Sequence, residues 1–488
     1  MTAFSQGVKK VDRKILRGGK VVTMEPSRSL VETADILIED GKIAAIEPGI
    51  DRPDAEIIDI DGMIAFPGFV DTHRHIWQTA IRGVAANWTL VDYVKHIRLG
   101  YATVYHPEDV YLSNLVGALE AIDSGITTVC DFSHIMNSPE HADAALEGLV
   151  QSGIRALFCY GFYEVPLKNR YFASHQDRIR DAERILKSEL YNRQRLVTMN
   201  VALTEQGLVD DETTKKEVLF ARHNGLRMTA HVGTIGSPHG IRKLYDQGLM
   251  GPDFLFVHCN RSTDEELRIV ADYGSAVSVT PETELQMGMG FPVTGRLLRL
   301  GMKPSIGIDI VSDCSGDMFT QMRLALQVER ALQNEKLIRE NQVPTKIPLT
   351  VLDALRFATV NGAAAVGMMS EIGTLAPGKH ADIAVLNTDR INFMPEADPV
   401  EAIVLQARPE NIDTVLIGGQ IRKRHGKLTG VDLAALREAI RRSKERIRGL
   451  VETADRELTA EYVKVLENHA YGSILKRIES QSNSDHRH

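Results

Sequence analysis

The sequence predicts an α/β protein, a (β/α)8 barrel of the TIM type with a small β-sandwich domain built from both chain ends. Two observations lead to this prediction. Short apolar runs alternate with longer helical patterns about eight times through the middle of the chain, as in a parallel barrel. Before and after this middle part, apolar and polar residues alternate and glycine or aspartate marks the turns, which indicates β structure.

The β segments lie at opposite ends of the chain. The early ones are ILRGGKVVTM, ADILIEDGKIAAIEPG and AEIIDIDG, all within residues 14–60. The late ones are GTLAPGKHADIAVLN (373–387) and TVLIGGQIRKRHGKL (414–428). Their alternation is typical of antiparallel strands. We therefore expect residues 1–66 and 373–430 to form one composite domain.

The middle part, residues 67–372, is expected to form the barrel. Its apolar runs are IAFPGFV, ITTVCDF, RALFCYGF, LVTMNVAL, LRMTAHV, FLFVHC, AVSVTP and PSIGID. They are apolar almost throughout, because barrel strands are covered on both faces. PEDVYLSNLVGALEAIDSG and PEHADAALEGLVQSG are two of the helical patterns between them. Residues 431–488 predict a charged helical extension, and its end, SQSNSDHRH, is expected to be disordered.

Composition excludes several classes of function. The chain of 488 residues has a formal net charge of -8, which argues against a nucleic-acid partner. No run reaches the roughly 18 apolar residues of a membrane span, and the N-terminus lacks the apolar core of a secretory signal. The four cysteines are far apart and form no CxxC pair, as expected for free thiols. We therefore expect a cytoplasmic protein that acts on a small molecule.

Residues that can bind a metal follow four of the apolar runs. The first run leads into His73 and His75, which are two apart and so face the same side of an extended segment. Later runs end at His231, His258 and Asp309. A barrel places its active site where the strands end at their C-terminal face. Imidazole and carboxylate groups suit Zn²⁺ and also Fe²⁺.

Several stretches resemble the amidohydrolase superfamily, in particular its one-metal deaminases and chlorohydrolases, such as cytosine deaminase, S-adenosylhomocysteine deaminase and triazine hydrolase. PGFVDTHRHIWQTAIRGV (67–84) looks like the opening of their barrel, and LEAIDSGITTVCD (119–131) is similar to the segment before their second strand. PETELQMGMGFPVTGRLLRLGMKPSIGID (281–309) and NGAAAVGMMSEIGTLAPGKHADIAVL (361–386) resemble their late segments. The resemblance extends from about residue 14 to about residue 430.

The resemblance implies one divalent ion, expected to be Zn²⁺ with Fe²⁺ as the alternative. Its ligands would be His73, His75, His231 and Asp309. Asp309 would also accept a proton from the attacking water, and His258 would contact the substrate or that water. The strand-four candidate, RLVTMNVALTEQG, contains no lysine of the kind that bridges two metals in relatives, which favours one ion.

Other residues are expected to line the pocket. The resemblance implies that Gln78 faces the substrate, and His134 follows the second strand. Deaminases of this group typically carry a glutamate three residues after the strand-five histidine, but this chain has Thr234 there. A carboxylate from Glu282 or Glu284 could replace the missing one.

These observations predict a hydrolase that cleaves a C–N bond of a small, heterocyclic substrate with metal-activated water. Thr234 keeps an alternative open, the hydrolysis of an amide, urea or carbamate bond, where no ring nitrogen needs a proton. A metal-dependent lyase or decarboxylase on the same site is a further alternative. A purely structural barrel would have gaps in the ligand set, and all four residues are present. The resemblance also implies a homo-oligomer.

Overall fold

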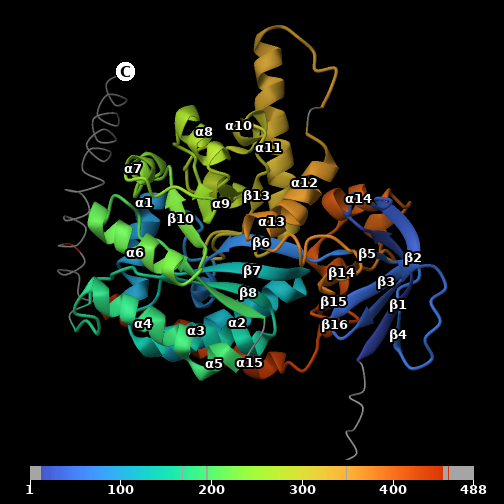
Figure 1. Ribbon diagram of the computed structural model, residues 1–488, viewed down its shortest axis with the longest axis horizontal. Coiled ribbons are helices and arrows are strands. Elements are labelled where there is room, and N and C mark those ends of the chain that lie inside the picture. The colour runs from blue at the N-terminus through green and yellow to red at the C-terminus, as the bar shows by residue number, and fades with distance from the viewer. Residues whose placement is uncertain (1–11, 168, 194–195, 348, 454–459, 461–488) are drawn as a thin grey trace, which may run out of the picture.

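The computed structural model describes residues 12–167, 169–193, 196–347, 349–453 and 460. Two sheets lie beside each other: a parallel barrel surrounded by helices and a smaller sheet of strands from the two chain ends (Figure 1). This confirms the predicted fold class. No described helix has the length and apolar character needed to cross a membrane.

The barrel sheet has eight parallel strands in strict chain order, from β6 to β13. They are β6 (Phe69–Arg74), β7 (Ile126–Ser133), β8 (Arg155–Gly161), β9 (Val197–Ala202), β10 (Met228–Val232), β11 (Phe254–His258), β12 (Ala276–Val279) and β13 (Ser305–Ile306). Nearly all residues of these strands are buried, in agreement with their continuous apolar sequences.

The barrel closes between its first and last strands through the backbone of the candidate metal ligands. The amide of Asp309 donates to the carbonyl of His73 at 2.8 Å, and the amide of His75 donates to the carbonyl of Asp309 at 2.7 Å. Gly307 makes this approach possible, because a Cβ atom there would lie 2.7 Å from the His73 carbonyl oxygen and 2.8 Å from its nitrogen. Closure therefore brings Asp309 against both histidines.

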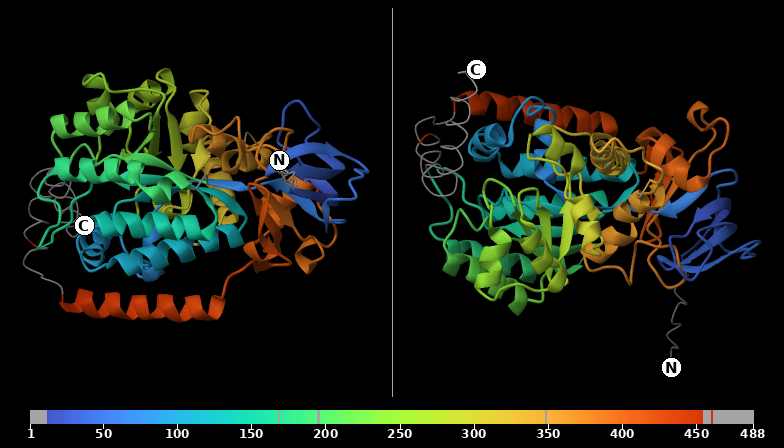
Figure 2. Two further views of the ribbon diagram at one scale, coloured as in Figure 1. Left: turned by 60° about the horizontal axis from the view of Figure 1, so that its bottom comes forward. Right: turned by 90° about the horizontal axis from the view of Figure 1, so that it is seen from above.

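Helices connect the strands on the outside of the barrel (Figure 2). The predicted helical patterns form α2 (Pro107–Asp123) and α3 (Pro139–Ser152). The remaining helices that connect barrel strands are α1 (Leu90–Tyr93), α4 (His175–Lys187), α5 (Glu189–Arg193), α6 (Asp211–His223), α7 (Gly240–Asp246), α8 (Asp264–Asp272), α9 (Pro281–Gln286) and α10 (Thr294–Arg299), with the 3-10 helices η1 (Ile76–Ile81) and η3 (Tyr101–Thr103) and the π-helix η2 (Val94–Arg98). After the last strand follow α11 (Met318–Arg339), α12 (Val351–Ala358) and α13 (Val360–Ala365).

The smaller sheet contains nine strands from the two chain ends. They are β1 (Arg13–Val22), β2 (Val31–Glu39), β3 (Lys42–Glu47), β4 (Glu56–Asp59), β5 (Ile64–Pro67), β14 (Ile383–Leu386), β15 (Ile412–Ile417), β16 (Gln420–Arg424) and β17 (Lys427–Leu428). Strand β14 pairs with β5, so the late segment joins the early one. Between β14 and β15 lie α14 (Pro399–Glu401), η4 (Ile391–Phe393), η5 (Ala402–Gln406) and η6 (Pro409–Asn411).

Two expectations need correction. The β ends are not purely antiparallel, since β4 and β5 both run parallel to β1. The run IAFPGFV is not one barrel strand, because Ile64–Pro67 is β5 of the smaller sheet and the barrel begins at Phe69. Gly68 lies between them, where a Cβ would come within 2.1 Å of the Thr127 side chain. The chain changes sheets at this glycine because only a residue without a side chain fits.

The extension after the smaller sheet begins with α15 (Leu433–Thr453), which runs along the outside of the barrel against α2 (Figure 2). Ser443 donates to the buried Asp109 carboxylate at 2.6 Å, and Ile447 is fully buried. The predicted disordered end, SQSNSDHRH, lies outside the described residues. The domain boundaries at residues 66, 372 and 430 stay a prediction.

Candidate metal centre

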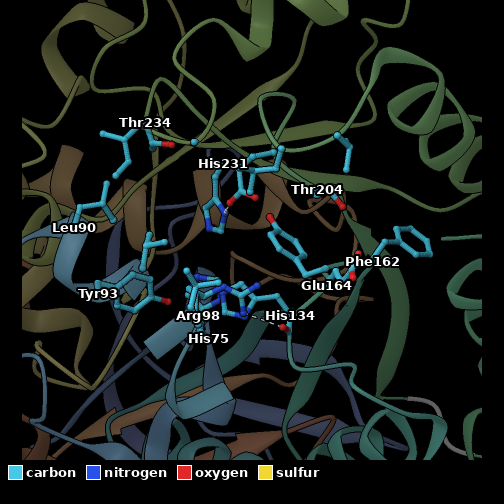
Figure 3. Close-up of a pocket in the computed structure, with 18 of the residues that line it drawn as sticks. His75, Leu90, Tyr93, Arg98, His134, Phe162, Glu164, Thr204, His231 and Thr234 are labelled. Atoms are coloured by element: carbon cyan, nitrogen blue, oxygen red, sulfur yellow. Dashed lines mark hydrogen bonds and ion pairs between the residues drawn. The ribbon is translucent and has the colours of Figure 1, made fainter. Parts of the chain in front are cut away.

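A cavity of about 400 Å³ opens at the C-terminal ends of the barrel strands. Its lining includes His75, His231, His258 and Asp309, each at or just after the end of a different strand. Figure 3 shows His75 and His231 on this wall. His73 lies beneath them on β6 and is completely buried. The structure thus brings together all five residues that the strand ends predicted.

The ligand-type atoms of this group converge on one point. Asp309 Oδ1 lies 3.3 Å from His73 Nε2 and 3.4 Å from His75 Nε2. His231 Nε2 lies 3.3 Å from His73 Nε2. In a tetrahedral zinc site, ligand atoms about 2.1 Å from the ion lie roughly 3.4 Å from one another. The spacing therefore fits a single ion of this size.

Hydrogen bonds on the far side of two rings turn their lone pairs toward this point. His75 Nδ1–H donates to the Phe132 carbonyl at 2.7 Å, which leaves Nε2 of His75 unprotonated. His231 Nδ1–H donates to Glu205 Oε1 at 3.1 Å, a carboxylate–histidine pair of the kind that orients metal ligands. Within the described chain His73 Nδ1 has no such partner, and this ring packs against Phe132, His231 and His258.

The pKa values of the group agree with a cation site. Burial lowers the pKa of His73 to about 4, so this imidazole is neutral at physiological pH. Burial would raise the pKa of Asp309, but its hydrogen bond with His73 and the nearby histidines outweigh burial and hold it well below the usual range. The unprotonated Nε2 of His75 and the Asp309 carboxylate, 3.4 Å apart, repel one another unless a cation lies between them. The donor set is therefore arranged for a bound ion.

His258 lies beside this group and is held from behind. Its Nδ1 lies 3.0 Å from Thr280 Oγ1 and 3.3 Å from Glu284 Oε1, and its Nε2 lies 3.9 Å from Asp309 Oδ2. Burial lowers the pKa of His258, but the Glu284 hydrogen bond and the Asp309 charge more than compensate and raise it. His258 and Asp309 adopt positive φ angles of 71° and 73°, a strained backbone conformation for residues with side chains.

Two of the expected pocket residues line the cavity and two do not. His134 and Thr234 are part of the lining. His134 stacks on His75 with ring centroids 4.0 Å apart, and its Nδ1 accepts from the Trp77 indole at 2.9 Å, so its own proton is on Nε2. Gln78 and Glu282 are not among the lining residues, and their role in substrate binding stays a prediction.

The side chains of Gln78 and Glu282 form hydrogen bonds with residues around the cavity wall or outside it. Gln78 lies on η1, donates to the Tyr93 hydroxyl at 2.7 Å and accepts from Ser312 at 2.8 Å, so it supports a residue of the cavity wall. Glu282 accepts from Ser315 Oγ at 2.8 Å and from Gln321 at 2.9 Å. Glu284, the other candidate replacement for the missing carboxylate, is fully buried behind His258.

Sequence reasoning missed most of the other lining residues, among them the polar residues Tyr93, Arg98, Tyr163 and Glu205. A signal existed for Glu205, because it follows the apolar strand β9 just as the predicted ligands follow theirs. Burial raises the pKa of Glu205, but its hydrogen bond with His231 outweighs burial and lowers it, so the carboxylate is ionised. Tyr93 and Arg98 lie in a short helical segment before α2 and had no comparable signal.

Comparison with known proteins places the chain in a family. The model of the amidohydrolase family matches residues 64–422. A 5'-deoxyadenosine deaminase from Methanothermobacter thermautotrophicus is 28% identical over 82% of this chain and 91% of the relative. A 5-methylthioadenosine/S-adenosylhomocysteine deaminase from Acetivibrio thermocellus is 27% identical over 86% of this chain and 95% of the relative.

Solved structures show the same fold. A crystal structure of an adenosine deaminase from Xanthomonas campestris with bound zinc has a TM-score of 0.78 at 24% identity, over 89% of this chain and 98% of the other. A mutant of atrazine chlorohydrolase from Arthrobacter aurescens, complexed with zinc and atraton, has a TM-score of 0.78 at 20% identity, over 89% of this chain and 100% of the other. With a family match across most of its length, the chain belongs to the amidohydrolase family.

Proposed function

We propose that the protein is a hydrolytic deaminase that removes an amino group from a small heterocyclic ring. One divalent ion, Zn²⁺, would be held by His73, His75, His231 and Asp309. The observation that carries this proposal is the convergence of their donor atoms at separations of 3.3–3.4 Å. The deaminases among the relatives and the zinc in two similar structures support it.

The residues around the ion would divide the chemistry among them. When bound, zinc lowers the pKa of a coordinated water from about 15.7 to about 7. Asp309 is ionised and reaches both the ligand group and His258, so it can take the proton of that water and pass it to the leaving nitrogen. His258 can donate a hydrogen bond to the charge that develops on the substrate. His134, with its proton on Nε2, is a second donor in the cavity wall.

Thr234 bears on which of two hydrolytic reactions the site performs. It lines the cavity where related deaminases place a glutamate, and its hydroxyl cannot serve as a carboxylic acid. Glu205 is ionised and bonded to His231, so it is a poor proton donor. Deamination of a ring amine then depends on Asp309 for proton transfer. Hydrolysis of an amide, urea or carbamate, which requires protonation of only the leaving nitrogen, is the second candidate.

Ammonia release tests the proposal. Zinc-loaded protein would be incubated with amino-substituted purines, pyrimidines, pterins and triazines, with His73→Ala as the blank and the exposed His223→Ala as the control. Ammonia from a ring amine in wild type and His223→Ala, absent in the blank, is the expected result. One bound ion per chain without ammonia from any ring amine would overturn deamination and favour amide-type substrates. Repeating the assay with Fe²⁺ identifies the metal, and light scattering checks the expected homo-oligomer.

A further inference from the structure

Arg98 occupies an unusual position in the cavity wall. It is the last residue of the π-helix η2, Val94–Arg98, which continues α1 after its Thr89 cap. Single π-helical turns are rare and often occur at functional sites, because they change the direction of a side chain. Figure 3 shows Arg98 beside His75 and His134, on the side of the cavity next to the candidate metal centre.

The guanidinium group of Arg98 is held by neutral groups. Its Nη1–H donates to the carbonyl of His134 at 2.9 Å, and its Cζ lies 4.8 Å from the centroid of the Tyr163 ring. Among the described residues, no carboxylate forms an ion pair or hydrogen bond with it. Its Nε and Nη2 form no hydrogen bond with another described residue and are not fully buried, and Arg98 is part of the cavity lining.

The carboxylates of the cavity are all engaged by other groups. Asp309 contacts His73 and His75, Glu205 contacts His231, and Glu164 pairs with Arg170. The buried Arg178, which donates to the Met136 carbonyl, adds a further positive charge to the same lining. The charge of Arg98 helps to lower the pKa of Glu205, but that carboxylate bonds to His231, so the half-buried guanidinium has no directly bonded acidic partner. A carboxylate on a ligand would offset part of the free-energy cost of burying this cation.

We propose that Arg98 binds a carboxylate on the substrate and thereby selects for anionic substrates. One planar guanidinium with two free neighbouring donors, Nε and Nη2, matches one carboxylate in bidentate geometry. Arg98 bonds to His134, which stacks on His75, so the carboxylate would lie close to the reacting carbon. The substrate class, a ring amine that carries a carboxylate, rests on the proposed function, whereas carboxylate binding by Arg98 does not.

Binding of benzoate and of its neutral analogue benzamide tests Arg98 without any turnover. Calorimetry with zinc-loaded protein should give benzoate a Kd roughly tenfold or more higher in Arg98→Met than in wild type, because a charge-assisted hydrogen bond is lost. Benzamide should bind the two proteins alike. Arg98→Lys keeps the positive charge but lacks the planar guanidinium with its paired donors, so we expect an intermediate Kd for benzoate. Lys95→Met removes a charge from the same π-helix outside the cavity and should bind benzoate like wild type.

Turnover then tests the substrate class. Pterin-6-carboxylate and pterin-6-carboxamide are nearly equal in shape and differ in charge, as are cytosine-5-carboxylate and cytosine-5-carboxamide. Wild type should release ammonia from the acid of a pair with a kcat/KM at least tenfold higher than from the amide, and Arg98→Met should remove this difference. Zinc content and thermal midpoint, unchanged in Arg98→Met, would show that the variant is folded.

The outcomes distinguish the two proposals. Benzoate binding that depends on Arg98, without ammonia from any ring amine, retains the carboxylate site and overturns deamination. Ammonia release that is equal for acid and amide, and unchanged in Arg98→Met, retains deamination and overturns the role of Arg98. Benzoate that fails to bind wild type, or binds Arg98→Met equally well, also overturns it.

Discussion

The inner and outer ends of the cavity are built in different ways. The inner end consists of His73, His75, His231, His258 and Asp309, which come from strand ends and are held by the barrel backbone. The rest of the cavity wall, called the outer end here, consists of residues from the connecting segments, such as Arg98, which adjoins the inner end, Tyr163 and Glu164. The inner end therefore determines the kind of reaction, and the connecting segments determine which molecule reaches it.

The largest effect is expected from breaking the inner end at Asp309. Asp309→Asn removes both a charged ligand and the proposed proton acceptor. Turnover of the substrate identified by ammonia release should fall by about 10³-fold or more, and zinc content should fall with it. Steady-state kinetics and elemental analysis measure the two quantities. Asp272→Asn, an exposed change at the end of α8, should leave both unchanged. A near-normal rate in Asp309→Asn would contradict the proposed chemistry.

The backbone support of the inner end can be tested at Gly307. The added Cβ of Gly307→Ala would meet the His73 backbone at 2.7–2.8 Å and push β13 away from β6. We expect Gly307→Ala to lower the free energy of unfolding by about 1–3 kcal/mol and to weaken zinc binding. Urea unfolding measures the first effect, and zinc titration measures the second. Gly449→Ala on α15, where no atom lies within 4 Å of the new Cβ, should not destabilise the protein. Equal results for the two variants would show that close packing at the seam is unimportant.

Glu205 and Glu164 allow a direct comparison of the two ends, because both carboxylates line the same cavity. Glu205→Gln keeps an acceptor for His231 but removes its charge, and we expect zinc affinity to decrease about 10- to 100-fold. Glu164→Gln, at the outer end, should leave zinc affinity unchanged. Competition with a chelator of known affinity measures both. Similar zinc affinities in the two variants would mean that Glu205 does not support the metal centre.

A smaller effect is expected in the pH dependence of stability, from Glu217 on α6. This buried carboxyl group accepts from the Thr204 amide at 2.9 Å, next to Glu205, and burial raises its pKa to about 8. Throughout the range from pH 5 to pH 8 this carboxyl group is mostly ionised in the unfolded chain, while the folded protein keeps much of its proton. The free energy of unfolding should therefore decrease as pH rises through this window.

Urea unfolding of wild type and Glu217→Gln at pH 5, 6.5 and 8 tests this dependence. The variant cannot lose a proton there, so its stability should decrease by about 2–4 kcal/mol less than that of wild type. Asp71 and Asp131, whose pKa values burial raises to about 7, will leave some dependence in both proteins. Identical slopes would show that Glu217 is ionised in the folded protein throughout.

The contrast between the inner and outer ends of the cavity also explains how much of the fold and of the site could be predicted from the sequence. The strand ends were predictable because period-two alternation places His73 and His75 on one side and apolar runs lead to His231, His258 and Asp309. Gln78 lies only three residues beyond His75, but the chain has already turned into η1, which points it toward Tyr93. The position of the Arg98 side chain depends on a π-helical turn, and no periodic pattern of residues in the sequence indicates such a turn. The division of IAFPGFV at Gly68 depends on the Thr127 side chain of another strand.

The seam between β6 and β13 has a consequence for the fate of the protein without its ion. Its backbone bonds join the very residues whose side chains would hold that ion, so metal depletion should weaken this seam, which Thr72 and Asp71 also bridge with hydrogen bonds. Closure is what removes the edges of a sheet, and a free parallel edge can pair with another chain. Metal-starved protein should therefore self-associate through this edge before its core unfolds, and supply of the ion would govern solubility as well as activity.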